Sequence, residues 1–108
     1  MKPYVLYGDR RSGSAAVEMA LAAAGAPYEL RSVPLEGDRQ LSAEHRTLNP
    51  LGRVPVLVLP DGAVVTESLA ILLSVADRHP EAELLPPPGD PDRAAALRWM
   101  ATLAGELY

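Results

Sequence analysis

The sequence contains no cysteine and no phenylalanine, and these absences limit what the 108-residue chain can do. Without cysteine there is no structural disulfide, no thiolate zinc site and no Cys-x-x-Cys redox centre. Any sulfur chemistry therefore has to use sulfur that a ligand brings. Without phenylalanine the core has to be built from leucine, valine and alanine, and a hydrophobic content of 48% is enough for one domain.

Clustered positive charge and long apolar runs are also missing. The formal net charge is −4, which argues against binding to nucleic acid because phosphate contacts need clustered Lys and Arg. No apolar run reaches the roughly 18 residues of a membrane-spanning helix, and no leader sequence precedes the first predicted strand. We therefore expect a cytoplasmic protein with no membrane partner. His45 and His79 are far apart in the sequence and neither belongs to a metal-ligand motif, so we expect solvated histidines at helix ends and no metal.

The first half of the chain alternates strands and helices. Residues 4–7 form a β-branched and aromatic run that predicts a strand. An Ala-rich helix is expected over residues 15–24, where Gly25 ends it. Alternating apolar residues predict a second strand over residues 28–35. Residues 39–48 are expected to form a weak, polar helix or an irregular segment.

The second half begins with two more strands and a helix. Strands are expected over residues 54–59 and 63–66, and the connection is short enough for a β-hairpin. Apolar residues at i, i+3, i+4 and i+7 predict a helix over residues 67–79, which Pro80 ends. The order β-α-β-α-β-β-α predicts an α/β, thioredoxin-like fold with a mixed four-stranded sheet covered by helices.

A proline-rich segment separates this unit from one more predicted helix. We expect residues 1–80 to form the α/β domain and residues 81–91 to be a stiff linker. Residues 92–108 are expected to form an amphipathic helix whose apolar stripe has no evident partner, which predicts the first helix of an incomplete helical domain. Two alternatives are that this helix folds back on the sheet or pairs with another copy of the chain.

Residues 49–68 carry the strongest functional signal. Val54-Pro55 stands at the entrance to an apolar strand, and a proline at the start of a strand is an edge or terminal residue. X-Pro is also the common place for a cis peptide bond, which turns the preceding backbone outward. Glu67-Ser68 begins the following helix, and a helix N-terminus attracts a carboxylate through free N–H groups and the helix dipole. The stretch therefore predicts a peptide-binding edge.

The residues quoted so far resemble the N-terminal, glutathione-binding domain of cytosolic glutathione transferases. Two motifs carry the resemblance: Asn49-Pro50-x-Gly52-Arg53-Val54-Pro55-Val56-Leu57 and Thr66-Glu67-Ser68-x-Ala70-Ile71. The resemblance covers residues 1 to about 80, and residues 91–108 resemble the first helix of the family's helical C-terminal domain. It implies glutathione as co-substrate, a small electrophile as second substrate and a homodimer.

The resemblance also assigns parts of glutathione to residues of the two motifs. It implies that Val54 presents its backbone N–H and C=O to the cysteinyl part, and that Pro55 is the cis-proline that allows this. Glu67 would bind the ammonium and Ser68 the carboxylate of the γ-glutamyl end; alternatively, both residues only cap the helix. Arg53 would pair with the glycyl carboxylate, or else be a solvated loop arginine.

The family also implies a group that favours the thiolate form of the bound thiol, which is the nucleophilic form. The segment before the first helix offers Ser12 and Ser14. Ser12 matches the family's Ser-Gly pattern and is the first choice, and at least one of the two serines is expected to cap the helix. Tyr7 lies within a predicted strand and is expected to be packed. The resemblance therefore implies a serine-type glutathione transferase; the alternative is a non-catalytic binding or regulatory module on the same scaffold.

Overall fold

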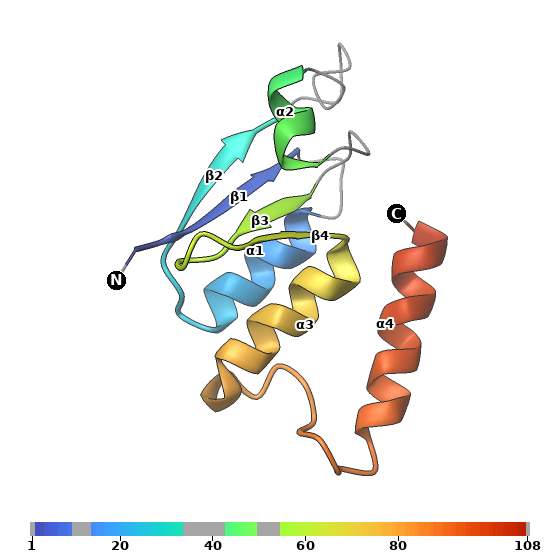
Figure 1. Cartoon of the computed structure of the whole chain (residues 1–108). Helices are drawn as coiled ribbons and strands as arrows, with labels where there is room; N and C mark the ends of the chain where they lie inside the picture. The colour runs from blue at the N-terminus through green and yellow to red at the C-terminus, as the bar shows by residue number, and fades with distance from the viewer. Residues whose placement is uncertain (1, 10–13, 34–42, 50–54, 108) are drawn as a thin grey trace.

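A four-stranded mixed sheet lies at the centre of the molecule (Figure 1). We analysed a computed structural model, which describes residues 2–9, 14–33, 43–49 and 55–107. The strands are β1 (Tyr4–Gly8), β2 (Tyr28–Ser32), β3 (Val56–Val58) and β4 (Val64–Thr66). Their order is β2-β1-β3-β4, in which β1 pairs in parallel with β2 and the other pairs are antiparallel. The α/β, thioredoxin-like fold expected from the sequence is confirmed.

The helices pack on one face of this sheet or lie beside it (Figure 1). They are α1 (Ser14–Ala23), α2 (Ala43–Leu48), α3 (Ser68–Arg78), the short 3₁₀-helix η2 (Pro80–Ala82) and α4 (Arg93–Leu107). Helices α1 and α3 pack side by side on one face of the sheet, whereas α2 lies apart from them, at the end of the sheet where β1 and β2 finish (Figure 1).

Helix α1 ends as its sequence predicts. Gly25 has a φ of +67°, in the left-handed region that glycine adopts without steric cost. Its N–H donates to the Ala22 carbonyl, and the N–H of Ala26 donates to the Leu21 carbonyl. This pair of hydrogen bonds satisfies carbonyls that the end of the helix leaves open, and it directs the chain back toward β2.

The core lies between the sheet and the α1–α3 layer. Alternate residues of β1 point into it, because successive side chains of a strand face opposite sides. The helices contribute residues spaced by four, which share one face. The buried core cluster consists of Tyr4, Leu6, Val17, Leu21, Ala26, Leu57, Leu59, Ile71 and Val75. The core therefore consists mainly of leucine, valine and alanine, as expected, and also contains one tyrosine and one isoleucine.

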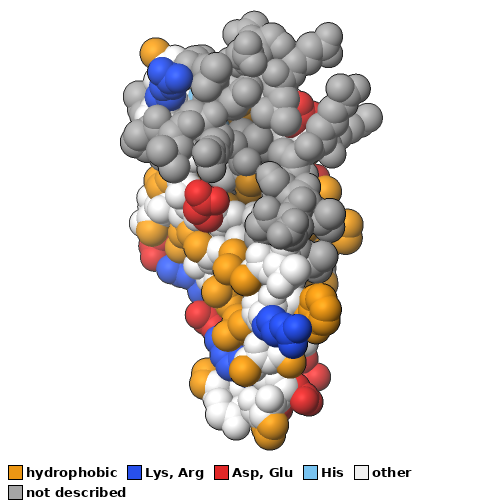
Figure 2. All heavy atoms as spheres, turned by 90° about the vertical axis from the view of Figure 1, so that its right-hand side faces the viewer, with side chains coloured by type: hydrophobic (Ala, Val, Ile, Leu, Met, Phe, Trp, Pro, Cys, Tyr) orange, Lys and Arg blue, Asp and Glu red, His pale blue; other side chains and the backbone are white. Residues whose placement is uncertain are grey.

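Helix α4 is attached to this unit but adds little to its core. It packs beside α3, and Leu84 of the connecting segment packs against the core cluster. Arg93 at the start of α4 donates a hydrogen bond of 2.7 Å to the Pro86 carbonyl. None of the side chains described for residues 93–102 is buried, and Trp99 is 57% exposed. Figure 2, which looks onto the side that carries α4, shows apolar side chains on this surface.

Candidate functional site

Three segments of the predicted site meet at one end of the sheet. Tyr7 and Thr66 both pair with Val56, so the end of β1, the start of β3 and the end of β4 lie level with one another. Pro55 precedes β3 directly and is buried. Glu67 follows β4 directly and leads into α3. The register thus brings Pro55 and Glu67, which are twelve positions apart in the sequence, to the same end of the β3–β4 pair.

Glu67 has an unusual backbone conformation. Its φ is 71° and its ψ is 122°, a region that is costly for any residue with a side chain. It is the N-cap of α3, and its carbonyl accepts a hydrogen bond of 2.9 Å from the N–H of Ile71. Its side chain makes no capping hydrogen bond and is exposed. The interpretation that Glu67 serves as a side-chain cap is therefore not supported, and its carboxylate is available to a ligand.

Ser68 is the first residue of α3 and is 8% exposed. The N–H groups of the first turn of a helix have no partner within the helix and point out of its N-terminal end. Together with the helix dipole they favour a negative charge at this place. The N-terminal end of α3, which by this argument favours a carboxylate, thus directly follows the exposed, negatively charged Glu67.

Ser14, the second candidate for the sulfur contact, is 2% exposed at the start of α1. Its hydroxyl donates a hydrogen bond of 2.7 Å to the carbonyl of Asp9. Its side chain also occupies the space beside Gly8, where a Cβ atom would collide with it. Ser14 therefore ties the end of β1 to the start of α1.

Three of the predicted site residues fall outside the described residues: Ser12, Arg53 and Val54. Their assignments, and the cis form of the Val54–Pro55 bond, remain predictions. The residues that the structure does place, namely Ser14, Pro55, Glu67 and Ser68, belong to segments that finish or begin at the same end of the sheet.

Tyr7 is packed, as expected, but in a contact that the sequence did not predict. Its hydroxyl accepts a hydrogen bond of 3.0 Å from Arg31, whose guanidinium carbon lies 5.7 Å from the centre of the Tyr7 ring. This hydrogen bond is the main cause that raises the pKa of Arg31. The Tyr7 ring also lies 6.4 Å from the ring of His45 in α2, measured between ring centres. Only the pairing of β1 with β2, which aligns Tyr7 with Arg31, identifies this set of residues.

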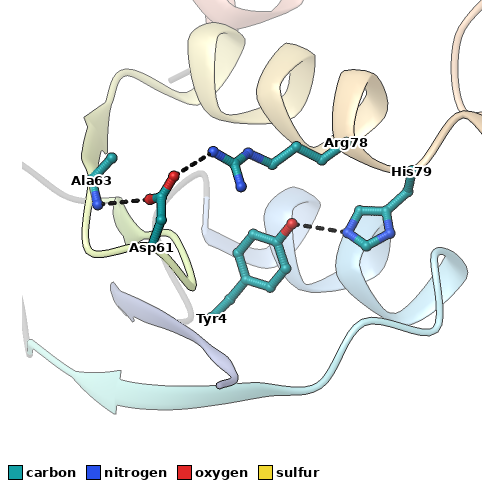
Figure 3. A network of polar contacts seen from close by, with 5 residues as sticks. All are labelled: Tyr4, Asp61, Ala63, Arg78 and His79. Atoms are coloured by element: carbon teal, nitrogen blue, oxygen red, sulfur yellow. Dashed lines mark hydrogen bonds and ion pairs between the residues drawn. The ribbon is translucent and has the colours of Figure 1, made fainter. Parts of the chain in front are cut away.

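The expectation that both histidines are solvated was wrong. His45 is 4% exposed beneath α2. His79 follows α3, and its Nε2 shares a hydrogen bond of 2.8 Å with the buried Tyr4 hydroxyl (Figure 3). Each ring is covered by residues distant in sequence, which a local pattern does not reveal. Among the described residues, no group of three or more metal-ligating side chains occurs.

The β3–β4 turn is tied to the end of α3 in the same region. The Asp61 carboxylate accepts hydrogen bonds of 3.0 Å from the N–H of Ala63 and 2.9 Å from Arg78 (Figure 3). The hydrogen bond from Ala63 is the main cause that lowers the pKa of Asp61, and the hydrogen bond from Arg78 is the second.

Within the described part of the chain, no helix is both long and apolar enough to cross a membrane.

Comparisons with known proteins point to one family. The model of a family described as "Glutathione S-transferase, N-terminal domain" matches residues 14–78. Glutathione S-transferase GstA of Escherichia coli O157:H7 is 34% identical over 96 residues, which are 88% of this chain and 48% of that protein. Maleylacetoacetate isomerase of Rattus norvegicus is 38% identical over 104 residues, which are 94% of this chain and 47% of that protein.

The fold is shared with solved structures of similar proteins. A glutathione transferase homologue from Sulfitobacter, solved with bound glutathione, superposes with a TM-score of 0.86 at 34% identity, over 98% of this chain and 50% of that one. A glutathione transferase from Methylococcus capsulatus gives a TM-score of 0.86 at 38% identity, over 96% and 52% of the two chains. The chain thus spans about half the length of the relatives it matches.

Proposed function

The chain belongs to the glutathione S-transferase family, and on this basis we propose that it binds glutathione at the sheet end formed by Pro55, Glu67 and Ser68. The observation that carries the proposal is Glu67, which has a strained backbone with a positive φ and an exposed side chain directly before the first residue of α3. A strained residue persists only where the surrounding structure holds it, and such residues cluster at binding sites.

The γ-glutamyl end of glutathione fits this place because it carries both charges. Its carboxylate would accept hydrogen bonds from the Ser68 hydroxyl and from the N–H groups of the first turn of α3. Its ammonium would pair with the Glu67 carboxylate. The solved Sulfitobacter relative holds glutathione on the same fold, which supports this assignment.

The cysteinyl and glycyl parts would lie along the segment that leads into β3. We assign the backbone N–H and C=O of Val54 to the cysteinyl part, with Pro55 as a cis-proline, and Arg53 to the glycyl carboxylate. Pro55 is buried directly before β3, and this burial supports the assignment because it fixes the residue at which the chain enters β3.

The thiol would be activated by Ser12, in a serine-type transferase. A hydroxyl that donates a hydrogen bond to sulfur favours the thiolate, which then adds to an electrophile and forms a carbon–sulfur bond. Ser14 is the weaker candidate, because its hydroxyl already donates to the Asp9 carbonyl and its side chain is buried. With no cysteine in the chain, a mixed disulfide between the protein and glutathione is not part of the mechanism.

The complete enzyme would need more than this chain. We propose a cytoplasmic homodimer that acts on a small electrophile. Residues 81–91 would be its linker and residues 92–108 the first helix of a helical domain. The greater length of the relatives and the exposed side chains of α4 support this division. The alternative is a glutathione-binding module without catalysis.

Glutathione affinity tests the binding proposal. Titration calorimetry of the 108-residue chain should show saturable binding at millimolar glutathione or below, and Ser68→Ala should weaken it at least tenfold, because a charge-assisted hydrogen bond is lost from a ligand carboxylate. Ser74→Ala is the matched control, since the Ser74 hydroxyl lies on the same helix and donates to the Ala70 carbonyl. No binding at millimolar glutathione would refute the proposal.

Conjugation assays separate the enzyme from the binding module. A transferase should lose thioether formation with an aromatic electrophile when Ser12 is changed to alanine, while its glutathione affinity is retained. Wild-type chain that binds glutathione but forms no thioether above the uncatalysed rate would favour the binding module.

A further inference from the structure

We propose that β2 is a self-complementary edge strand, through which two copies of this chain pair in antiparallel fashion. The pairing is centred on Leu30 and places Glu29 of each copy opposite Arg31 of the other. The inference goes beyond the proposed function, because this pairing needs neither glutathione nor an electrophile.

Strand β2 forms one outer edge of the sheet (Figure 1). It has five residues, whereas β4, the edge strand on the other side, has three. All residues of β2 after Tyr28 are exposed, and Leu30 at its centre presents an apolar side chain that is 49% exposed. An edge strand of this kind offers a row of backbone N–H and C=O groups to another strand.

The hydrogen bonds at the two ends of the β1–β2 ladder show which backbone groups of β2 face the open edge. The N–H of Tyr4 donates to the Pro27 carbonyl at 3.0 Å. The N–H of Val33 donates to the Gly8 carbonyl at 2.8 Å. Because the backbone groups of successive strand residues point alternately to the two sides of the strand, all odd-numbered residues of β2 face β1. The N–H and C=O groups of its even-numbered residues therefore point away from the sheet.

These outward groups fit a second copy of β2 that runs in the opposite direction. When Leu30 pairs with Leu30 of the second copy, each residue can donate to and accept from the other, as in a hydrogen-bonded pair of an antiparallel sheet. Tyr28 of each copy then pairs with Ser32 of the other in the same way. The two-fold axis passes between the two Leu30 residues, so the same surface serves both copies.

The charges of β2 select this register. Glu29 and Arg31 leave the same face of the strand, and both side chains are 56% exposed. In the pairing centred on Leu30, Glu29 lies opposite Arg31 of the other copy on both sides of the axis, at positions where cross-strand side chains approach closely. An antiparallel pairing centred on either charged residue, or a parallel pairing in register, would place like charges opposite one another, which is unfavourable.

Arg31 can contact a second copy and keep its contact with Tyr7. Its Nη1 donates to the Tyr7 hydroxyl at 3.0 Å, whereas its Nη2 lies at the longer distance of 3.4 Å from the carboxylate of Glu29. Because this second contact is exposed, Nη2 can bind the carboxylate of the other copy in its place. The proposed glutathione site lies by β3 and β4, on the other side of β1 from this edge.

A strand pair of this length gives a weak dimer. It is smaller than the roughly 1,200 Å² of buried surface at which standard stable interfaces begin. Main-chain hydrogen bonds supply much of the affinity when one strand adds to the edge of a sheet. The exposed ion pairs add register and are screened by salt. We therefore expect association at high protein concentration, and less of it at high ionic strength.

Sedimentation velocity of the 108-residue chain tests the proposal from about 10 µM to about 1 mM. The wild type should change from monomer to dimer within this range. Glu29→Arg and Arg31→Glu should each raise the dissociation constant roughly tenfold or more, because each places like charges opposite one another. Mixed in equal amounts, the two variants should form a heterodimer, since one then carries two cations on β2 and the other two anions.

Amide hydrogen exchange identifies the strand that pairs. At high protein concentration the amides of Tyr28, Leu30 and Ser32 should exchange more slowly, because their outward N–H groups become hydrogen-bonded. The amides of Glu29 and Arg31 face β1 and should change little. Leu30→Pro removes the central outward N–H but no hydrogen bond of the ladder to β1, so it should abolish the dimer and leave the circular dichroism spectrum unchanged.

Arg98→Glu is the matched control for Arg31→Glu. It makes the same change of charge at an exposed residue of α4, and it should leave association unchanged. A wild type that stays monomeric at about 1 mM would refute the inference. A dimer that Arg31→Glu leaves intact, or a mixture of the two charge variants without a heterodimer, would do so as well. None of these outcomes depends on glutathione, so failure of this inference and failure of the proposed function are separate results.

Discussion

Gly8→Ala tests how closely the end of β1 packs against the start of α1. A Cβ atom at Gly8 would collide with the Cβ of Ser14 and lie 2.5 Å from its hydroxyl oxygen. Ser14 is 2% exposed and hydrogen-bonded to the Asp9 carbonyl, so its side chain has little room to move. Either the strand end or the first turn of α1 therefore has to shift.

Two opposing effects set the size of the change. Replacing a glycine by alanine stabilises a protein by about 0.4–1 kcal/mol where the backbone tolerates it, because the unfolded chain loses freedom. Overpacking costs about 1–3 kcal/mol, and displacing the Ser14 hydroxyl from Asp9 costs about 1 kcal/mol more. The clash is the larger effect, and we expect a net loss of about 1–3 kcal/mol in the free energy of unfolding.

Urea unfolding of four proteins measures this loss: wild type, Gly8→Ala, Ser14→Gly and the double variant. A loss of 1 kcal/mol corresponds to about 4–8 °C in melting temperature for a domain of this size. Removing the Ser14 side chain should restore much of the stability that Gly8→Ala loses, because the colliding atoms are then gone. If Gly8→Ala is as stable as wild type, or if the two losses simply add, the packing argument is wrong.

Three further changes test other parts of the structure. Tyr4→Phe removes the hydrogen bond to His79 and should cost about 1 kcal/mol in urea unfolding. Burial is the main cause that raises the pKa of Tyr4 above 10.0. The neutral tyrosine thus adds stability that is fully present below pH 10.0 and lost as the pH rises through the raised value, and Tyr4→Phe should lack this alkaline loss. The hydrogen bond from Ala63 is the main cause that lowers the pKa of Asp61 below 3.8. Its stabilisation is therefore present above pH 3.8 and lost as the pH falls through the lowered value; an acid titration of Asp61→Asn with the same acid loss as wild type would contradict this. Glu67→Gly should relieve backbone strain and raise the free energy of unfolding by about 1 kcal/mol while weakening glutathione binding, and a loss of stability would show that the positive φ is not strained.

The order of elements was predictable because it depends on local patterns. The alternation in β2 and the spacing of apolar residues in α3 each identify an element by its own period, and the β-branched and aromatic composition of β1 identifies that strand. Gly25 marks the end of α1 because the turn needs a left-handed residue. The strands of the hairpin are shorter than expected, and β2 ends at Ser32, because the extent of a strand depends on which partner residues lie beside it.

The site was predictable in part for the same reason. Proline before a strand and Glu-Ser before an apolar run are local signals, and the structure brings Pro55, Glu67 and Ser68 to one end of the sheet. The strained backbone of Glu67 was not predictable, because a φ of 71° at a non-glycine residue follows from how β4 meets α3. The burial of His45 and the hydrogen bond of the half-buried His79 were missed because their partners, Tyr7 and Tyr4, are far away in the sequence.

The sequence by itself determined which elements form, the absence of any protein thiol, and the two motifs that identify the family. These properties depend on residue type and short-range spacing. Only the tertiary structure decided that the Ser14 hydroxyl is taken by Asp9 and that Tyr7 turns toward Arg31 and His45. The physical reason is that a side chain's partners depend on strand register and helix packing. Both are set by the sum of many weak contacts along the whole chain.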